Sequence, residues 1–357
     1  MSEPQTPTHE MRAVTLDDVA RTAGVSRATA SRVVGGSAHV SSQARLAVEH
    51  AIEELDYAVE APVRNPSLVS NSVGVVITET TTKMFGDPFF SPLMKGIYAA
   101  LAERSILLVM LAPHSARDME LTESYLIDKH VDGAILVSLH GDNPLPMHLV
   151  EHHVPTVICG RPPKGVATSS VDSDNRQGGA LAVEHLIAQG RRRIATIAGN
   201  LDMPGAIDRL MGYRDALTAA GIALDPTLEE VADYQPDKAH IAMERLLLNH
   251  PDLDAVFAAS DLMAAAALRV LHQARKRVPE DIAIIGFDDS PTAWVTRPPL
   301  SSIRQPIEEM GHEAVNVLMR EMADPDEAPR QVTFALELVI RASTGGSAVG
   351  ETALGGR

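Results

Sequence analysis

The sequence predicts two domains of different fold class. A small all-α helix-turn-helix domain comes first, and a two-lobed α/β domain with parallel sheets flanked by helices follows it. Three observations predict this arrangement. Residues 14–57 carry helix caps, a turn glycine and apolar positions at helical spacing. From Val73 onward, apolar runs typical of buried strands alternate with amphipathic segments. The 357 residues also exceed the length of one ordinary domain.

The first predicted helix begins after Thr15, whose hydroxyl can cap it, and Asp18 follows three residues later as a variant of the capping box. Gly24 suits the sharp turn between two helices, because that turn needs a residue with positive φ. Ser26 is then placed to cap the second helix. Caps and turn therefore fall at the offsets that a helix-turn-helix requires.

The second helix presents a polar face that suits duplex DNA. Thr29, Ala30 and Val33 fit helical packing, which leaves the other face to a ligand. The residues available on that face are Arg27, Ala28, Ser31 and Arg32. Such a helix enters the major groove, where arginine can read O6 and N7 of guanine. A plain surface helical hairpin is the alternative, and the offsets of caps and arginines count against it.

The charge distribution qualifies this interpretation. The formal net charge is −16, which is unusual for a protein that binds DNA. Between Arg12 and Val48, however, five arginines and two aspartates give a net charge of +3. A basic face on an acidic body can orient the molecule on the duplex. It also discourages non-specific coating, because few phosphates would be neutralised.

Composition indicates a cytoplasmic protein. The single cysteine, Cys159, excludes a disulfide framework and a cysteine-based zinc site, and it suits a reducing compartment. No apolar run approaches the roughly 18 residues that span a bilayer. The first residues are polar and lack the apolar segment of a signal peptide.

The remainder of the chain predicts parallel sheets covered on both faces. Strands are expected at VGVVI, ILLVMLA, DGAILVS, PTVICG, RIATIAG, LDAVFAAS and DIAIIGFDD. Helices are expected at residues 92–104, 118–130, 175–189 and 207–220. Two similar halves predict two lobes with a cleft between them. Ligands of open α/β sheets bind outside the carboxyl ends of the strands.

Polar and aromatic groups at the predicted strand ends suit a sugar. Carboxylates and arginines hold hydroxyl groups, and aromatic rings stack on the flat CH faces of a sugar. Aromatic residues make up only 3% of the chain, so their positions are informative. The candidate effector-binding residues are Asp87, Phe89, Phe90, Ser138, Arg161, Arg209, Tyr234, Ser260 and Asp288. In the alternative, purely structural interpretation, Asp288 caps a loop, Arg209 lies on a helix surface, and Phe89 and Phe90 pack in the core or between the lobes.

Catalysis and metal binding find little support. The chain carries no G-x-S-x-G, Walker loop, G-x-G-x-x-G or H-E-x-x-H motif, so we expect no enzyme activity and no cofactor. His148 and His152 stand at i and i+4, which is a possible metal pair. No suitable third ligand is evident, so a solvated helix face is the favoured interpretation and no metal is expected.

At the level of motifs, VTLDDVARTAGVSRATASRVV resembles the opening of the lactose/galactose repressor (LacI/GalR) family of bacterial transcription regulators almost position by position. AIEELDY is similar to the end of that family's third helix, and the resemblance runs from about Val14 to Arg341. It implies a periplasmic-binding-protein-like effector domain. It also implies a repressor that binds a pseudo-palindromic operator as a homodimer and responds to a small-molecule effector, a sugar, in the cleft.

The resemblance assigns roles by position. It makes Arg27 and Ala28 the main specificity residues, supported by Arg32. The expected DNA-binding set is Thr15, Leu16, Ser26, Arg27, Ala28, Thr29, Ser31, Arg32 and His39. Family equivalents of Phe89, Arg209, Tyr234, Ser260 and Asp288 contact effector. Ser260 departs from the usual asparagine, and Gly160 replaces an aspartate beside Arg161, which favours a different ligand, anionic or larger.

The hinge also departs from the family pattern. Val59 and Glu60 replace a Pro-Asn pair, and Pro66 stands where a leucine wedges into the minor groove. A proline inside a helix costs about 3 kcal/mol. We therefore expect the hinge helix to be weak, shifted or absent. In the alternative, Pro66 is itself an adequate wedge.

These patterns predict the following domains. Residues 1–11 are a disordered N-terminal segment, 12–60 the helix-turn-helix domain, 61–72 the hinge linker, 73–341 the effector-binding and dimerisation domain, and 342–357 a disordered tail. Lobe one is expected at 73–171 and 304–328, and lobe two at 172–303 and 329–341, with crossings near Val171, Arg304 and Pro329. The tail lacks leucine heptads, which favours a dimer. Competing functions are a transport sugar-binding protein, disfavoured by the DNA-binding segment, and a sugar-modifying enzyme.

Overall fold

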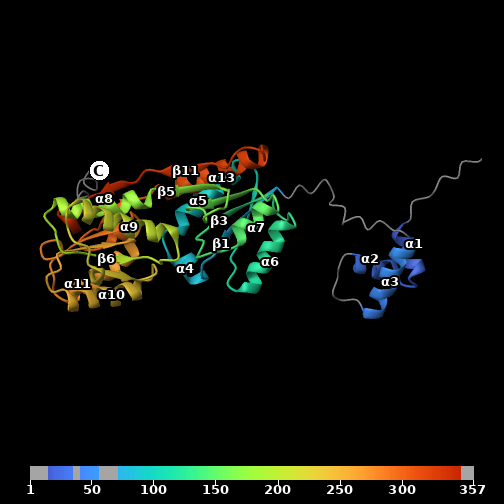
Figure 1. Ribbon diagram of the computed structural model, residues 1–357, viewed down its shortest axis with the longest axis horizontal. Helices are drawn as coiled ribbons and strands as arrows, with labels where there is room; N and C mark the ends of the chain where they lie inside the picture. The colour runs from blue at the N-terminus through green and yellow to red at the C-terminus, as the bar shows by residue number, and fades with distance from the viewer. Residues whose placement is uncertain (1–14, 35–40, 56–70, 347–357) are drawn as a thin grey trace, which may run out of the picture. The chain divides into compact units, whose positions relative to one another are not determined.

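The computed structural model describes residues 15–34, 41–55 and 71–346, and the chain divides into two units at Val69 and Ser70 (Figure 1). The predicted N-terminal segment, His39, the hinge with Pro66 and residues 347–357 lie outside the described residues. Residues 342–346 are ordered, whereas the sequence predicted a disordered tail after residue 341. Ser343 is buried there, and its hydroxyl donates to the carbonyl of Ile284.

The first unit contains the predicted helix-turn-helix. Its helices are α1 (Leu16–Thr22), α2 (Arg27–Val34) and α3 (Ser42–Glu54). Thr15 and Asp18 form a capping box at α1, with the Thr15 N–H donating to Asp18 Oδ2 over 3.0 Å. Gly24 has a φ of +65° in the turn, and Ser26 Oγ accepts from the Thr29 N–H over 3.1 Å to cap α2. The buried core of this unit is Val19, Ala20, Ala30, Val33, Val48 and Ala51.

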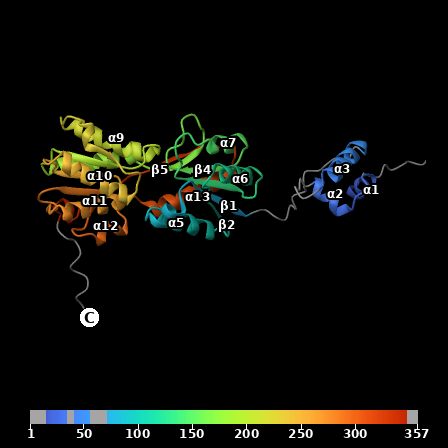
Figure 2. The same cartoon turned by 90° about the horizontal axis from the view of Figure 1, so that it is seen from below.

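The second unit contains two six-stranded sheets, in agreement with the predicted two-lobed α/β fold (Figure 2). The first sheet has the order β11-β5-β4-β3-β1-β2, with β1 at Ser72–Ile77, β2 at Leu107–Leu111, β3 at Gly133–Val137, β4 at Thr156–Cys159, β5 at Ser169–Ser173 and β11 at Gln331–Phe334. The second has the order β12-β10-β9-β8-β6-β7, with β6 at Ile194–Ala198, β7 at Glu229–Val231, β8 at Ala255–Ala258, β9 at Ala283–Asp288, β10 at Ser301–Arg304 and β12 at Glu337–Val339. Neighbouring strands run parallel except β10 and β12, which are antiparallel. We call the parts built on the first and second sheets lobe one and lobe two.

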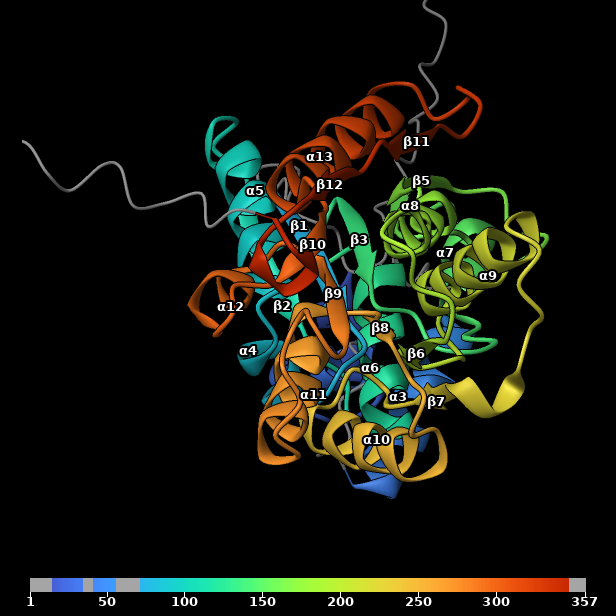
Figure 3. The ribbon, with the colours of Figure 1, turned by 90° about the vertical axis from the view of Figure 1, so that its left-hand side faces the viewer.

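Helices cover both faces of each sheet, because the central strands are apolar throughout. In lobe one these are α4 (Thr81–Gly86), α5 (Phe90–Ala102), α6 (Ala116–Ile127), α7 (Leu145–Glu151) and α13 (Ile307–Ala323). In lobe two they are α8 (Asn175–Ala188), α9 (Pro204–Ala219), α10 (Pro236–Asn249), α11 (Asp261–Gln273) and α12 (Pro291–Val295). Figure 3 shows lobe two with α8 and α9 apart from α10 and α11, and each pair has its own buried cluster. Parallel strands buried on two faces require such a three-layer arrangement.

The chain crosses between the lobes three times. It crosses after Ser173, after Arg304, and between Phe334 and Glu337. The first two crossings lie close to the expected ones. The third is later than the expected Pro329, because residues 331–334 form β11 and pair with β5 as a further parallel strand of lobe one.

Two glycines allow α5 and α13 to pack backbone against backbone. A Cβ at Gly96 would lie 1.9 Å from the carbonyl oxygen of Glu308, and one at Gly311 would lie 2.3 Å from the carbonyl oxygen of Leu93. Helices that approach so closely leave no room for a methyl group, since packed interiors contain few voids.

We predict that Gly96→Ala lowers the free energy of unfolding by about 3 kcal/mol, the upper part of the usual range for overpacking. The control is Gly86→Ala, because a Cβ at Gly86 would meet nothing within 4 Å. Urea unfolding of both variants and the wild type measures the difference. Equal stability of the two variants would contradict the close packing of α5 and α13.

Candidate functional site

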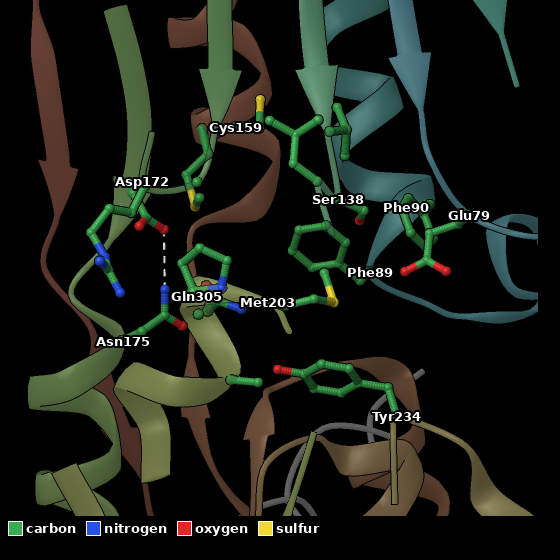
Figure 4. A pocket seen from close by; sticks show the side chains of 18 of the residues that line it. Glu79, Phe89, Phe90, Ser138, Cys159, Asp172, Asn175, Met203, Tyr234 and Gln305 are labelled. Atoms are coloured by element: carbon green, nitrogen blue, oxygen red, sulfur yellow. Dashed lines mark hydrogen bonds between the residues drawn. The ribbon is translucent and has the colours of Figure 1, made fainter. Parts of the chain in front are cut away.

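A cavity lies between the lobes at the carboxyl ends of the strands (Figure 4). It encloses about 890 Å³ of empty space, including the part that is open to solvent. Its main lining residues from lobe one are Glu79, Lys83, Asp87, Phe89, Phe90, Ser138, Cys159, Gly160, Arg161, Asp172 and Met310. Lobe two and the second crossing contribute Asn175, Met203, Arg209, Tyr234, Asp288 and Gln305. The site is therefore shared by both lobes.

Arg209 on α9 organises the lobe-two wall. It is buried, and its Nε donates to Asn175 Oδ1 over 2.8 Å while Nη1 donates to the Ala259 carbonyl over 2.6 Å. The guanidinium carbon lies 3.7 Å from the centre of the Phe287 ring, and Nη1 lies 3.6 Å from Asp288 Oδ1. A buried cation with this many partners has a fixed orientation, because each alternative would leave a polar group unsatisfied.

Asp288 ends β9 and is held by a crossing segment. Gln305 Nε2 donates to Asp288 Oδ1 over 2.7 Å, and Gln305 Oε1 accepts from Ser173 Oγ over 2.5 Å. Asp288 has a φ of +99°, and Ser138 and Tyr234 also have positive φ values, of +56° and +59°. Non-glycine residues in this region are strained, and such strain gathers at binding sites.

The cavity carboxylates lack full compensation for their burial. Burial raises the pKa of Asp288 to about 7 and that of Asp172 to about 6. Burial also raises the pKa of Asp87 above its usual range. Asp172 accepts a hydrogen bond from Asn175 Nδ2 over 3.1 Å, drawn in Figure 4. These acceptors would be better satisfied by hydroxyl groups of a bound ligand than by an empty cavity.

Arg161 is already paired. Its Nε and Nη2 each lie 3.1 Å from an oxygen of Asp208 on α9, and its side chain is 53% exposed. The expectation of an anionic ligand rested on this arginine, and the bidentate pairing removes its reason. The lining set as a whole carries four carboxylates against Lys83, Arg161 and Arg209, which favours a neutral ligand.

The structure brings together eight of the nine candidate effector residues. They are Asp87, Phe89, Phe90, Ser138, Arg161, Arg209, Tyr234 and Asp288. Ser260 does not line the cavity, because its Oγ accepts from the Met263 N–H as the buried cap of α11. The alternative positions for Arg209 on a helix surface and for Asp288 as a plain loop cap are not observed. Phe90 does pack in the core of lobe one while it lines the cavity.

Sequence reasoning missed several lining residues. The polar ones are Glu79, Lys83, Asp172, Asn175 and Gln305. Glu79 follows β1, and the last three lie in or beside crossing segments, so strand ends together with correctly placed crossings were the available signal. Cys159 and Met203 complete an apolar part of the wall, and burial raises the pKa of the Cys159 thiol to about 12.

Other sequence candidates lie elsewhere. His148 Nδ1 contacts Glu123 Oε1 over 2.9 Å, whereas His152 Nδ1 contacts the His148 carbonyl, so the two rings do not converge. Trp294 is 60% exposed and lies outside the cavity lining.

In the first unit the structure places the DNA-binding candidates on α1 and α2. Arg27 begins α2 and is exposed, Ser26 is the exposed cap, and Thr29 and Thr15 are half-buried. Leu16 lies in α1, and Ala28, Ser31 and Arg32 lie in α2. One face of α2 packs through Ala30 and Val33, as helical spacing predicted.

Comparison with known proteins places the chain in a family. Residues 15–59 match bacterial regulatory proteins of the lacI family, and residues 183–344 match a periplasmic binding protein-like domain. The HTH-type transcriptional regulator CelR of Thermobifida fusca is 44% identical over 338 residues, which cover 93% of this chain and 98% of CelR. The chain belongs to the lacI family. The ribose operon repressor of Escherichia coli (strain K12) is 35% identical over 334 residues, covering 92% and 99% of the two chains.

Solved structures agree with this assignment. The CelR–cellobiose complex has a TM-score of 0.74 and 44% identity, covering 92% of this chain and 99% of that chain. The lac repressor dimer bound to operator and the anti-inducer ONPF has a TM-score of 0.69 and 27% identity, covering 93% and 99%. This lacI-family chain is thus a transcriptional regulator with a DNA-binding helix-turn-helix and a two-sheet effector domain. No helix of its described residues is long and apolar enough to cross a membrane.

We predict that Asp288→Asn raises the thermal unfolding midpoint of the empty protein at about pH 8. The folded pKa of about 7 lies above the ordinary value of 3.8, so the stability linked to this proton is present at low pH and is lost as pH rises through about 7. The gain should therefore shrink below about pH 6.

The control is Asp281→Asn. Hydrogen bonds from Arg277 lower the pKa of Asp281 to about 2, so its replacement should lower the midpoint at neutral pH. Thermal unfolding of both variants across this pH range is the measurement. A lower midpoint for Asp288→Asn at about pH 8 would show that ionised Asp288 is stabilising.

Proposed function

We propose that this regulator represses transcription as a homodimer on a pseudo-palindromic operator and that a neutral disaccharide in the inter-lobe cavity controls its operator affinity. The sugar is bound and not turned over, without cofactor or metal, and the protein acts in the cytoplasm. The observation that carries the sugar proposal is the Arg209–Asp288 pair at the cavity wall, held by residues of lobe two and of a crossing.

The chemistry of the cavity supports a polyhydroxylated ligand. Half-buried Asp87 and Asp172 and buried Asp288 are acceptors with raised pKa values, and hydroxyl donors would satisfy them. Phe89 and Tyr234 lie on facing sides of the cavity in Figure 4, where rings can stack on the CH faces of a sugar.

Cellobiose is the first ligand to test. The relative CelR was solved with cellobiose, and it is 44% identical to this chain over 92% of its length. We infer that the present cavity binds a disaccharide of the same class through the eight lining candidates, with Arg209 and Asp288 holding hydroxyl groups. Closure of the lobes on the sugar would then change the geometry of the DNA-binding heads.

The operator proposal rests on two-fold symmetry. Two copies of α2 in a dimer would read half-sites related by a two-fold axis, which requires a pseudo-palindromic operator. Arg27, Ala28 and Arg32 are assigned to base edges, and Thr15, Leu16, Ser26, Thr29, Ser31 and His39 to contacts that set the register. The boundaries given above for the helix-turn-helix domain, the linker and the effector domain complete the proposal, with the third crossing moved to residues 335–336 and the effector domain extended to residue 346.

We predict that cellobiose changes operator affinity about 5- to 150-fold, a coupling of about 1–3 kcal/mol. Fluorescence anisotropy of labelled operator, with and without cellobiose, measures it, and calorimetry of the full chain measures sugar binding directly. Asp288→Ala should abolish the response and leave operator binding in the absence of sugar intact. Maltose and ribose are the matched ligands, and binding of ribose alone would contradict the disaccharide proposal.

We predict that Arg27→Ala costs about 1–3 kcal/mol at one operator base pair, because arginine discriminates guanine through two hydrogen bonds. The measurement is anisotropy against a panel of operators, each with one base pair replaced. The variant should become indifferent to a single position of the panel. An equal loss on every operator and on unrelated DNA would assign Arg27 to phosphate contacts.

A further inference from the structure

Three interactions join the lobes across the mouth of the cavity. His140 Nδ1, in the loop after β3, lies 2.8 Å from Asp202 Oδ1, in the loop after β6. The Gly141 N–H donates to the carbonyl of the same Asp202 over 3.0 Å. Farther along, Arg161 and Asp208 form the bidentate ion pair described above.

The His140–Asp202 contact joins two loops that are not part of the crossings. In lobe one β4 separates β3, the strand that precedes His140, from β5, where the first crossing begins. In lobe two β9 and β8 separate β10 from β6, the strand that precedes Asp202. A rotation about the crossings that separates the lobes must therefore break these bonds.

His140 lies between two carboxylates. Its Nε2 is 3.1 Å from Glu79 Oε1, while Nδ1 faces Asp202. Glu79 also contacts Lys83 Nζ over 2.5 Å. A neutral imidazole has one N–H and can donate to only one of the two acids, whereas an imidazolium donates to both. The geometry therefore suits the charged form of His140.

We propose that His140 and Asp202, assisted by Arg161 and Asp208, form a latch that holds the cleft closed and weakens as pH rises. The latch residues set the fraction of molecules in the closed state, and hence the apparent affinity for a ligand that binds that state. The part of this inference that concerns sugar affinity rests on the proposed function. The part that concerns closure of the lobes is independent of it.

The direction of the pH dependence follows from the groups around His140. The hydrogen bond to Glu79 is the largest effect and, with the bond to Asp202, it raises the pKa of His140 despite partial burial. Protonated His140 therefore stabilises the closed state fully below pH 6.5, the ordinary pKa of histidine. This stabilisation is lost as pH rises through the raised pKa of His140.

The neighbouring charged groups do not reverse this direction of the pH dependence. Burial alone would raise the pKa of Glu79, but hydrogen bonds from His140 and Lys83 lower it overall, so Glu79 stays ionised. Asp87 interacts with Lys83 and Glu79, and burial raises its own pKa. Asp172 and Asp288 titrate near the same pH but lie on the cavity wall. Their contribution is common to wild type and latch variants, so a ratio of the two removes it.

Cys159 supplies a measurement that needs no sugar. It is the single cysteine of the chain and lines the cavity, so its alkylation reports access to the open cleft. Iodoacetamide is uncharged and reacts with the thiolate. The experiment compares alkylation rates of the full-length wild type with those of His140→Gln and Asp202→Asn. The controls are His114→Gln and Asp142→Asn, at exposed positions of the same lobe as His140.

We expect both latch variants to react about three- to tenfold faster than wild type at about pH 6.5, because one partly exposed charged hydrogen bond is lost. The ratio of variant to wild-type rate should fall toward one by about pH 9, since the wild-type latch weakens there. The controls should give a ratio near one throughout. A latch-variant ratio near one at every pH, or a ratio independent of pH, would overturn the latch.

Calorimetry with cellobiose then separates the two proposals. If the latch holds, the variants bind cellobiose more weakly by the ratio of the closed fractions of wild type and variant, with unchanged circular dichroism. Altered alkylation without cellobiose binding by any form would refute the sugar and support the latch. Equal cellobiose affinity and equal alkylation in all forms would overturn the latch and leave the proposed function standing.

Discussion

The burial of one guanidinium, that of Arg209, constrains the rest of the cleft. A buried cation is tolerated only when its donors are satisfied, and here the carboxamide of Asn175, the carbonyl of Ala259 and the face of Phe287 surround it. A Cβ at Gly179 on α8 would lie 2.3 Å from the Arg209 carbonyl, so a glycine is needed to bring α8 and α9 this close. Backbone packing, the cation and the carboxylate of Asp288 are thus parts of one arrangement.

The local sequence pattern predicted the helices and strands. The roles of residues that depend on long-range contacts could not be predicted from it. Thr15, Gly24 and Ser26 fixed the head because capping acts within three residues. Strand ends located Asp288 and Phe89, since parallel strands present their carboxyl ends at one edge. Gln305 was not predicted as a cavity residue, because its position depends on which strands each crossing connects. Ser260 was misplaced because a strand-end hydroxyl can equally cap the next helix.

The cavity wall is costly for the fold. Half-buried Asp172 and buried Asp288 have pKa values near neutrality, and Ser138, Tyr234 and Asp288 have backbone angles that favour glycine. Each of these features lowers stability, and each faces the cavity. Binding sites commonly retain such strain because relieving it would remove the groups that a ligand needs. Packing of the two sheets against their helices offsets the stability that is lost at the cavity wall.

The three crossings also limit how the lobes can move. β5 pairs with β11 and β10 pairs with β12, so the connections leave each sheet from neighbouring strands, and the Ser173–Gln305 hydrogen bond ties two of them together. Two bodies joined along one line keep a single rotational degree of freedom, while sliding and twisting are resisted. A ligand that favours one value of this angle would change the proportion of molecules in two orientations of the lobes, whatever its chemistry.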